Sequence, residues 1–192
     1  MRPLKPIDPA SGNFQGLMLA AHPGLHDPNF RRSVLLLTMH TPEDGAFGFV
    51  LNQPLGKTAA DLLPQHEQSS LLARVPVYLG GPVGRDQLGF AGLDWDDKGK
   101  LLRLDTHLSL EDVSERLAQK KGAERVCAFV GYSGWSAGQL EEELAQKAWV
   151  LVKPQRTAAD RSSLTRLWFR LMGALGPSYK LLSAVPDDVS LN

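Results

Sequence analysis

The sequence contains one cysteine, no excess of charge of either sign and no long apolar run. A lone cysteine cannot form an internal disulfide, and Cys127 lies within an apolar stretch, which favours a small buried side chain over a reactive thiol. Basic and acidic residues number 21 each, so the formal net charge is zero. No overall electrostatic field therefore attracts the chain to nucleic acid or to an anionic membrane.

No stretch approaches the ~18 apolar residues of a membrane-spanning helix. The N-terminus has Pro3, Pro6 and Pro9 where a secretory signal peptide would have an apolar segment. We therefore expect a cytoplasmic protein that does not contact the membrane.

What is present is the composition of an ordinary globular protein. With 192 residues, 43% of them hydrophobic, the chain can bury a substantial core and most simply forms one domain. We expect a flexible N-terminal arm over residues 1–13 and a single domain over residues 14–192, because no repeat or linker divides the remainder.

The pattern of apolar runs and turn residues predicts an α+β domain. Strands are expected at residues 16–21, 33–39, 46–52, 75–79, 88–93, 100–104, 125–130 and 149–152. Helices are expected to begin at Thr58, Ser109, Ser136 and Asp160, which are residues of N-capping type. The prediction is a single compact domain with a strongly bent mixed sheet and about four helices.

The most distinctive stretch is residues 131–144, a glycine-rich turn that leads from a strand into a helix. Ser136 is predicted to cap that helix, with Gln139 reaching back to the N–H of the cap residue. Tyr132, Ser133 and Trp135 would then be displayed at the junction, where backbone N–H groups favour anions or carbonyl oxygens. We expect a binding site there.

Two expectations about this turn can be tested by a structure. Gly134 is expected to have a positive φ, because the chain must leave the strand at this point. Trp135 can stack on a ligand or seal the turn against Trp149, and we favour a partly exposed ring with a ligand role.

Several motifs along nearly the whole chain resemble the signature of the bacterial YqgE/AlgH family, also grouped as UPF0301. They are Gly131-Tyr132-Ser133-Gly134-Trp135 with Gln139-Leu140-Glu141, Asp27-Pro28-x-Phe30, Ser33-Val34, His40, Leu51-Asn52-x-Pro54, residues 76–83 and the closing Ser190-Leu191-Asn192. The resemblance implies a compact α+β domain with a bifurcated sheet bent into a pseudo-barrel. It implies no reaction, although one branch of the family is described as a regulator of alginate synthesis.

The candidate ligand-binding residues lie in the central turn and in the loops expected to face it. They are Asp27, Ser33, His40, Asn52, Tyr132, Ser133, Trp135 and Gln139. Asp27 before a proline and Asn52 before Gln53-Pro54 also have a turn-forming explanation, since their side chains can accept backbone N–H groups.

Catalytic and metal sites have weaker support. Ser133 lacks the second glycine of a nucleophile elbow. His22, His26, Asp27 and His40 have side chains that could bind a metal ion. Pro23 and Gly24 lie between His22 and His26, however, so these two histidines cannot share one face of a helix. Residues 94–99 resemble half of a calcium loop, but Lys98 occupies a ligand position and a hairpin is the better interpretation. We predict neither a metal nor a cofactor.

A basic stretch spans residues 147–180, with seven basic residues against the single acid Asp160. Arg166 and Arg170 lie one helical turn apart, on the face opposite the leucines, and are candidates for phosphate contact. A solvated helix face is the ordinary explanation.

Three functions follow. The preferred one is a non-enzymatic regulatory module that binds a small ligand or a protein partner at the central turn; the family resemblance adds a role in transcriptional regulation. The second is an enzyme with His40 as base, oriented by Asp27 or Glu143. The third is direct nucleic-acid binding through the basic stretch, which the zero net charge disfavours.

Overall fold

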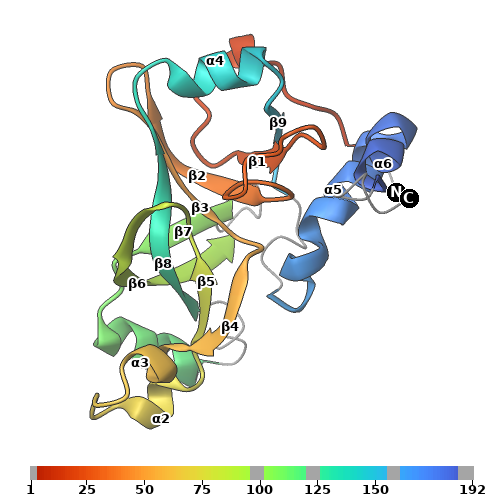
Figure 1. Ribbon diagram of the computed structural model, residues 1–192. Helices are drawn as coiled ribbons and strands as arrows, with labels where there is room; N and C mark the ends of the chain where they lie inside the picture. Colours follow the sequence, from red (N-terminus) through yellow and green to blue (C-terminus); the bar gives the residue numbers. More distant parts are fainter. Residues whose placement is uncertain (1–3, 96–101, 120–125, 155–160, 186–192) are drawn as a thin grey trace.

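The computed structural model describes residues 4–95, 102–119, 126–154 and 161–185. Its centre is a strongly curled mixed sheet that forms a half-barrel (Figure 1). The strands are β1 (Met18–Ala21), β2 (Val34–Thr41), β3 (Gly45–Val50), β4 (Pro54–Thr58), β5 (Pro76–Leu79), β6 (Val83–Trp95), β7 (Leu102–Thr106), β8 (Val126–Trp135) and β9 (Trp149–Val152). The α+β fold and the bent mixed sheet predicted from the sequence are confirmed.

The sheet divides at β8, which changes partners along its length. Residues 128–130 lie between β5, which runs parallel to β8, and β6, which runs antiparallel. The last three residues, Ser133 to Trp135, pair instead with β3, which leads on to β2, β1 and β9. One strand thus belongs to both branches of the sheet.

Alternate side chains of β8 enter two separate hydrophobic cores. Cys127 and Phe129 belong to the main core, which includes β1, β2, β3 and β9. Val126 and Ala128 belong to a smaller core under the helices at the lower end of the molecule in Figure 1. Since side chains of a strand point alternately to opposite faces, this apolar run is buried on both sides.

The helices are α1 (Ala59–Leu62), α2 (Ser69–Leu72), α3 (Leu110–Ala118), α4 (Gln139–Ala145), α5 (Leu167–Leu175) and α6 (Pro177–Ser183), with 3₁₀ turns η1 (Pro9–Ser11) and η4 (Arg161–Arg166). The predicted starts of α1 and α3 are confirmed. Ser109 Oγ accepts the N–H of Asp112 at 3.1 Å, and the Asp112 carboxylate accepts the N–H of Ser109 at 2.8 Å. These bonds from Ser109, through its side chain and its backbone, lower the pKa of Asp112.

Three short elements were not predicted: β4, α2 and α6. The residues of β4 are mostly exposed and have no apolar alternation, so only their pairing with β5 makes them a strand. Gly176 and Pro177 do end α5, as predicted, but Pro177 is also the first residue of α6, a position that proline favours.

The central turn was placed too early in the sequence. Residues 131–135 continue β8 as a strand, because β3 offers a hydrogen-bonding partner that outweighs their glycine content. The helix α4 begins at Gln139 rather than directly after Ser136. Gln139 nevertheless reaches back as predicted, accepting the N–H of Ser136 at 3.0 Å.

Gly131, not Gly134, carries the special backbone conformation. Its φ is +69°, and a Cβ there would lie 2.7 Å from the carbonyl oxygens of Gly81 and Val83. Gly134 has no positive φ, and the nearest atom to a Cβ at that position is in the Tyr132 ring at 3.6 Å. The expectation for Gly134 was therefore wrong, and the strained residue lies where β8 passes from one branch to the other.

We expect Gly131→Ala to destabilise the protein by well over the ~1 kcal/mol of an unstrained glycine replacement, because the new methyl group meets two carbonyl oxygens. Gly134→Ala, in the same strand, should change the free energy of unfolding by less than about 1 kcal/mol. Urea unfolding of both variants measures this difference. Equal losses in the two would contradict this account of β8.

Candidate functional site

His40 is buried, 5% exposed, and both of its ring nitrogens are engaged. Nδ1 accepts the backbone N–H of Phe14 at 3.2 Å, so the proton of the neutral ring lies on Nε2, which is 2.8 Å from the Glu141 carboxylate. The ring also stacks on Phe14 with centroids 4.3 Å apart. The acid that contacts His40 is thus Glu141 of α4, and not Asp27 or Glu143 as predicted.

Glu143, one turn of α4 away from Gln139, accepts three hydrogen bonds. Its Oε2 accepts the indole N–H of Trp135 at 2.9 Å and that of Trp149 at 2.7 Å. Its Oε1 accepts from the Gln139 amide at 3.0 Å. Since this carboxylate joins β8, β9 and its own helix, it holds α4 against the sheet.

Trp135 is 5% exposed, so the expected partial exposure of its ring was wrong. Its ring lies edge-to-face with Trp149 at 6.1 Å and stacks on Phe30 at 6.3 Å. The prediction of an exposed ring at a glycine-rich turn missed the burial of Trp135, because Glu143, the hydrogen-bond acceptor of its indole, comes from the following helix.

Of four more predicted residues, three hold turns and strands in place through hydrogen bonds. Asn52 accepts the N–H of Val34 at 2.7 Å and donates to the Arg32 carbonyl at 2.9 Å. Asp27 accepts the N–H of Asn29 at 2.8 Å, within its own turn. The remaining two, Ser33 and Ser133, are fully buried. Ser133 donates to the Gly80 carbonyl at 3.1 Å, whereas Ser33 Oγ has no hydrogen-bond partner among the described residues.

The predicted residues therefore divide into a buried group, His40, Trp135, Ser33 and Ser133, and the exposed Asp27 and Gln139. His40, Trp135 and Gln139 meet α4 or belong to it, and Phe30 brings the loop of Asp27 against Trp135. Tyr132 differs, because it points to the opposite face of β8 from Ser133 and Trp135. It is the one predicted residue that borders a described pocket. For the others a ligand role stays a prediction.

The pocket beside Tyr132 has a volume of about 450 Å³ and is called the aromatic pocket below. Its lining is Phe47, Phe49, Gln87, Leu88, Gly89, Ala91, Thr106, His107, Phe129, Gly131 and Tyr132. Tyr132 stacks on Phe47 with centroids 4.4 Å apart, and Phe47 meets Phe49 edge-to-face at 5.3 Å. Phe49 contacts Phe129 at 5.0 Å. Four rings from β3 and β8 thus form one wall.

The polar residues of the aromatic pocket are Gln87, Thr106 and His107. His107 is exposed and has a φ of +63°, a strained value for a residue with a side chain. Its Nδ1 lies 3.0 Å from Thr106 Oγ1. Sequence reasoning missed His107, whose strain is visible only in the structure. The alternation of Phe47 and Phe49 could have indicated a shared aromatic face.

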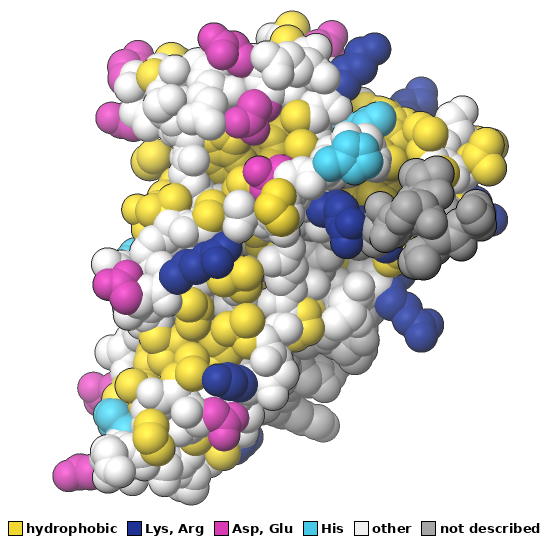
Figure 2. Space-filling model, viewed as in Figure 1, with side chains coloured by type: hydrophobic (Ala, Val, Ile, Leu, Met, Phe, Trp, Pro, Cys, Tyr) yellow, Lys and Arg dark blue, Asp and Glu magenta, His cyan; other side chains and the backbone are white. Residues whose placement is uncertain are grey.

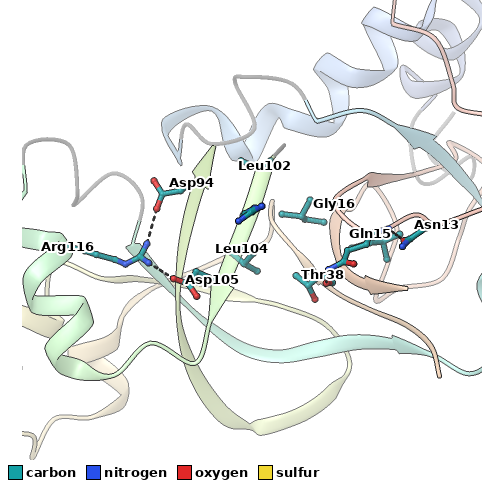
Figure 3. A pocket seen from close by; sticks show the side chains of 12 residues that line it. Asn13, Gln15, Gly16, Thr38, Asp94, Leu102, Leu104, Asp105 and Arg116 are labelled. Carbon is teal, nitrogen blue, oxygen red and sulfur yellow. Dashed lines mark hydrogen bonds and ion pairs between the residues drawn. The ribbon is translucent and has the colours of Figure 1, made fainter. Parts of the chain in front are cut away.

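A larger pocket, of about 750 Å³, lies between β7 and the segment before β1 (Figure 3). Arg116 of α3 binds two carboxylates on its wall: it is 2.8 Å from Asp94 and also pairs with Asp105. Arg116 thus neutralises the two carboxylates that a calcium ion would otherwise have bound. The predicted hairpin is confirmed by the pairing of β6 with β7, whereas Asp96, Lys98 and Gly99 lie outside the described residues.

The described residues contain no group of three His, Cys, Asp or Glu side chains that could hold a metal ion. His22 accepts the N–H of Gly24 at 3.1 Å, and burial, followed by the charge of Lys147, lowers its pKa. Arg166, the last residue of η4, is exposed, and Arg170 in the first half of α5 is half-buried. Among the described residues no helix is long and apolar enough to cross a membrane.

The fold defines an α+β domain with a divided, curled sheet that carries an aromatic-lined pocket. Comparison with known proteins gives the family. A family model described as AlgH-like, DUF179, matches residues 18–180. A UPF0301 protein of Thioalkalivibrio sulfidiphilus is 37% identical over 91% of this chain and 96% of its own. A UPF0301 protein of Streptomyces coelicolor is 37% identical over 94% and 96%. The chain belongs to the AlgH-like UPF0301 family.

Solved structures agree with this assignment. The solution structure of AlgH from Pseudomonas aeruginosa has a TM-score of 0.57 and 31% identity, over 88% of this chain and 93% of that one. A crystal structure from Corynebacterium diphtheriae has a TM-score of 0.65, covers 89% and 92%, and at 20% identity supports the fold alone.

We expect Glu143→Ala to destabilise the protein by about 2–4 kcal/mol, because two buried indole N–H groups lose their acceptor. Glu142→Ala, at the exposed neighbouring position of the same helix, should cost less than about 0.5 kcal/mol. Denaturant unfolding followed by tryptophan fluorescence measures both. A Glu143→Ala variant as stable as Glu142→Ala would show that this carboxylate does not hold α4.

Proposed function

We propose that this protein is a non-enzymatic ligand-binding module and that the aromatic pocket is its binding site. The observation that carries the proposal is a wall of four aromatic rings beside a rim of uncharged polar side chains. The pocket volume of about 450 Å³ lies within the range of small-molecule sites.

The chemistry of the lining narrows the class of ligand. No Lys, Arg, Asp or Glu is among the described lining residues, so a buried charge on the ligand would have no partner. Flat rings stack favourably on Phe and Tyr. The ligand we propose is a neutral planar molecule with one or two hydrogen-bonding groups, which Gln87, His107 or the Tyr132 hydroxyl can bind.

The contacts of His40 argue against the alternative function, an enzyme with His40 as its base. A general base must reach the proton that it removes, but Nδ1 of His40 already accepts from Phe14 and Nε2 faces Glu141. The catalytic alternative would need the N-terminal segment or α4 to move first.

The proposed role is regulatory, in the bacterial cytoplasm, with ligand occupancy as the signal. Its relatives come from bacteria, and one of the matching solved structures is named AlgH. A role in transcription is the part of this proposal that rests on the family resemblance alone.

A fragment-binding experiment tests the site. Indole and p-cresol, added to isotope-labelled protein, should shift the NMR signals of residues that line the aromatic pocket. Gly89→Leu should weaken this binding about tenfold or more, because the new side chain would occupy pocket space. A Cβ at Gly89 meets no atom within 4 Å, so the protein should tolerate the leucine.

Gly173→Leu is the matched control, because its Cβ also meets no atom within 4 Å and its helix does not line the pocket. It should bind like the wild type. Signals that move only outside the pocket, or equal binding by both variants, would refute the proposed site.

A further inference from the structure

The two C-terminal helices expose apolar side chains. Seven large hydrophobic residues are strongly exposed in the described part of the chain, and four of them are Phe169 of α5 and Leu181, Leu182 and Val185 at the end of α6. Leu181 is 73% exposed, the highest value of the seven. Exposed apolar side chains that gather in one place mark an interaction surface.

Basic side chains surround these apolar ones. Residues 161–185 include four basic residues and no Asp or Glu. Arg166 is the last residue of η4, three positions before Phe169, and Arg170 follows Phe169 directly in α5. The Arg32 guanidinium lies 5.2 Å from the Phe169 ring of α5 and 3.3 Å from the carbonyl of Val185, which follows α6.

We call this set, Arg32, Arg166, Phe169, Arg170, Lys180, Leu181, Leu182 and Val185, the α5–α6 surface. Figure 2 shows hydrophobic and basic side chains next to one another on the side of the molecule that carries α5 and α6. The net charge of the whole chain is zero, but charges act mainly within about 10 Å at physiological salt. A partner that touches the described side chains of this surface meets four basic groups and no acidic one.

Basic and exposed apolar side chains occur together on this surface, and this combination indicates the kind of partner that it fits. A second copy would bring two positive surfaces together. Nucleic acid would engage the arginines but leave the leucines in water. The described pocket on this surface holds only about 50 Å³, too little for the side chains of a bound peptide. An anionic lipid bilayer offers negative headgroups beside acyl chains, the two environments that these residues need.

We propose that the α5–α6 surface binds anionic phospholipid bilayers reversibly, with Phe169, Leu181 and Leu182 entering the headgroup layer and Arg166, Arg170 and Lys180 contacting phosphates. This inference is independent of the aromatic pocket. It concerns peripheral contact and requires no spanning segment.

The test is co-sedimentation of the full chain with vesicles of phosphatidylglycerol and phosphatidylcholine, and with vesicles of phosphatidylcholine alone. Arg166→Gln with Arg170→Gln should weaken binding to the anionic vesicles about 25-fold, since each basic side chain near such a surface contributes about a fivefold factor. Leu181→Ser should weaken it several-fold, because it removes an inserted apolar group.

The matched controls change the same residue types elsewhere on the surface. Lys57→Gln with Arg103→Gln removes two exposed basic groups from β4 and β7, and Leu55→Ser replaces an exposed leucine of β4. Both should bind like the wild type, and circular dichroism should show every variant folded.

Three results would overturn the proposal: no sedimentation with anionic vesicles, equal sedimentation with phosphatidylcholine alone, or equal loss in the control variants. A different result would assign the surface to nucleic acid: the wild type binds a DNA duplex but no vesicles, and Arg166→Gln with Arg170→Gln abolishes the DNA binding.

Discussion

The whole architecture depends on one strand, β8, having hydrogen-bonding partners in both branches of the sheet. Its first half lies between β5 and β6, and its last three residues pair with β3. The change of partner requires Gly131, whose Cα has only hydrogen where any side chain would meet the carbonyl oxygens of Gly81 and Val83. Because side chains alternate along β8, the same strand sends Phe129 into the main core and Ala128 into the second one. Both cores and the aromatic pocket therefore share one backbone.

The helix α4 carries the second constraint. Its Glu143 accepts both indole N–H groups of Trp135 and Trp149, and its Glu141 faces the only buried histidine among the described residues, His40. A carboxylate that is placed between two otherwise buried donors has a large cost of removal, since each indole would lose its partner. These acids connect the stretch that resembles a binding turn to the sheet and to the N-terminal segment. They also move the candidate site away from the turn, to the open face of β8 where Tyr132 lies.

The two proposed sites use different physics. In the aromatic pocket, flat rings and uncharged polar groups exclude a charged ligand, because nothing in the described lining would compensate for its lost hydration. On the α5–α6 surface, charge and exposed apolar area occur together, and a bilayer headgroup layer satisfies both. A protein of zero net charge can still have such a surface because salt confines each charge to its own neighbourhood. Ligand sensing and peripheral attachment can thus coexist in one small domain.

The sequence by itself determined the α+β class, most strands, the capped starts of α1 and α3 and the family, since these follow from local periodicity, capping and motif order. It also indicated Tyr132, which borders the aromatic pocket and whose ligand role stays a prediction. Only the tertiary structure decided that residues 131–135 are strand, that Trp135 is buried and that Glu141 faces His40, because each depends on a partner that the local pattern does not specify. The strained backbone of His107 belongs to the same group. Asp27 accepts the N–H of Asn29 within its own turn, as its position before a proline indicated. Asn52 and Ser133 were chosen as site residues from their motifs, but their hydrogen bonds join segments up to 53 positions apart. Such contacts arise from packing, which a one-dimensional pattern cannot encode.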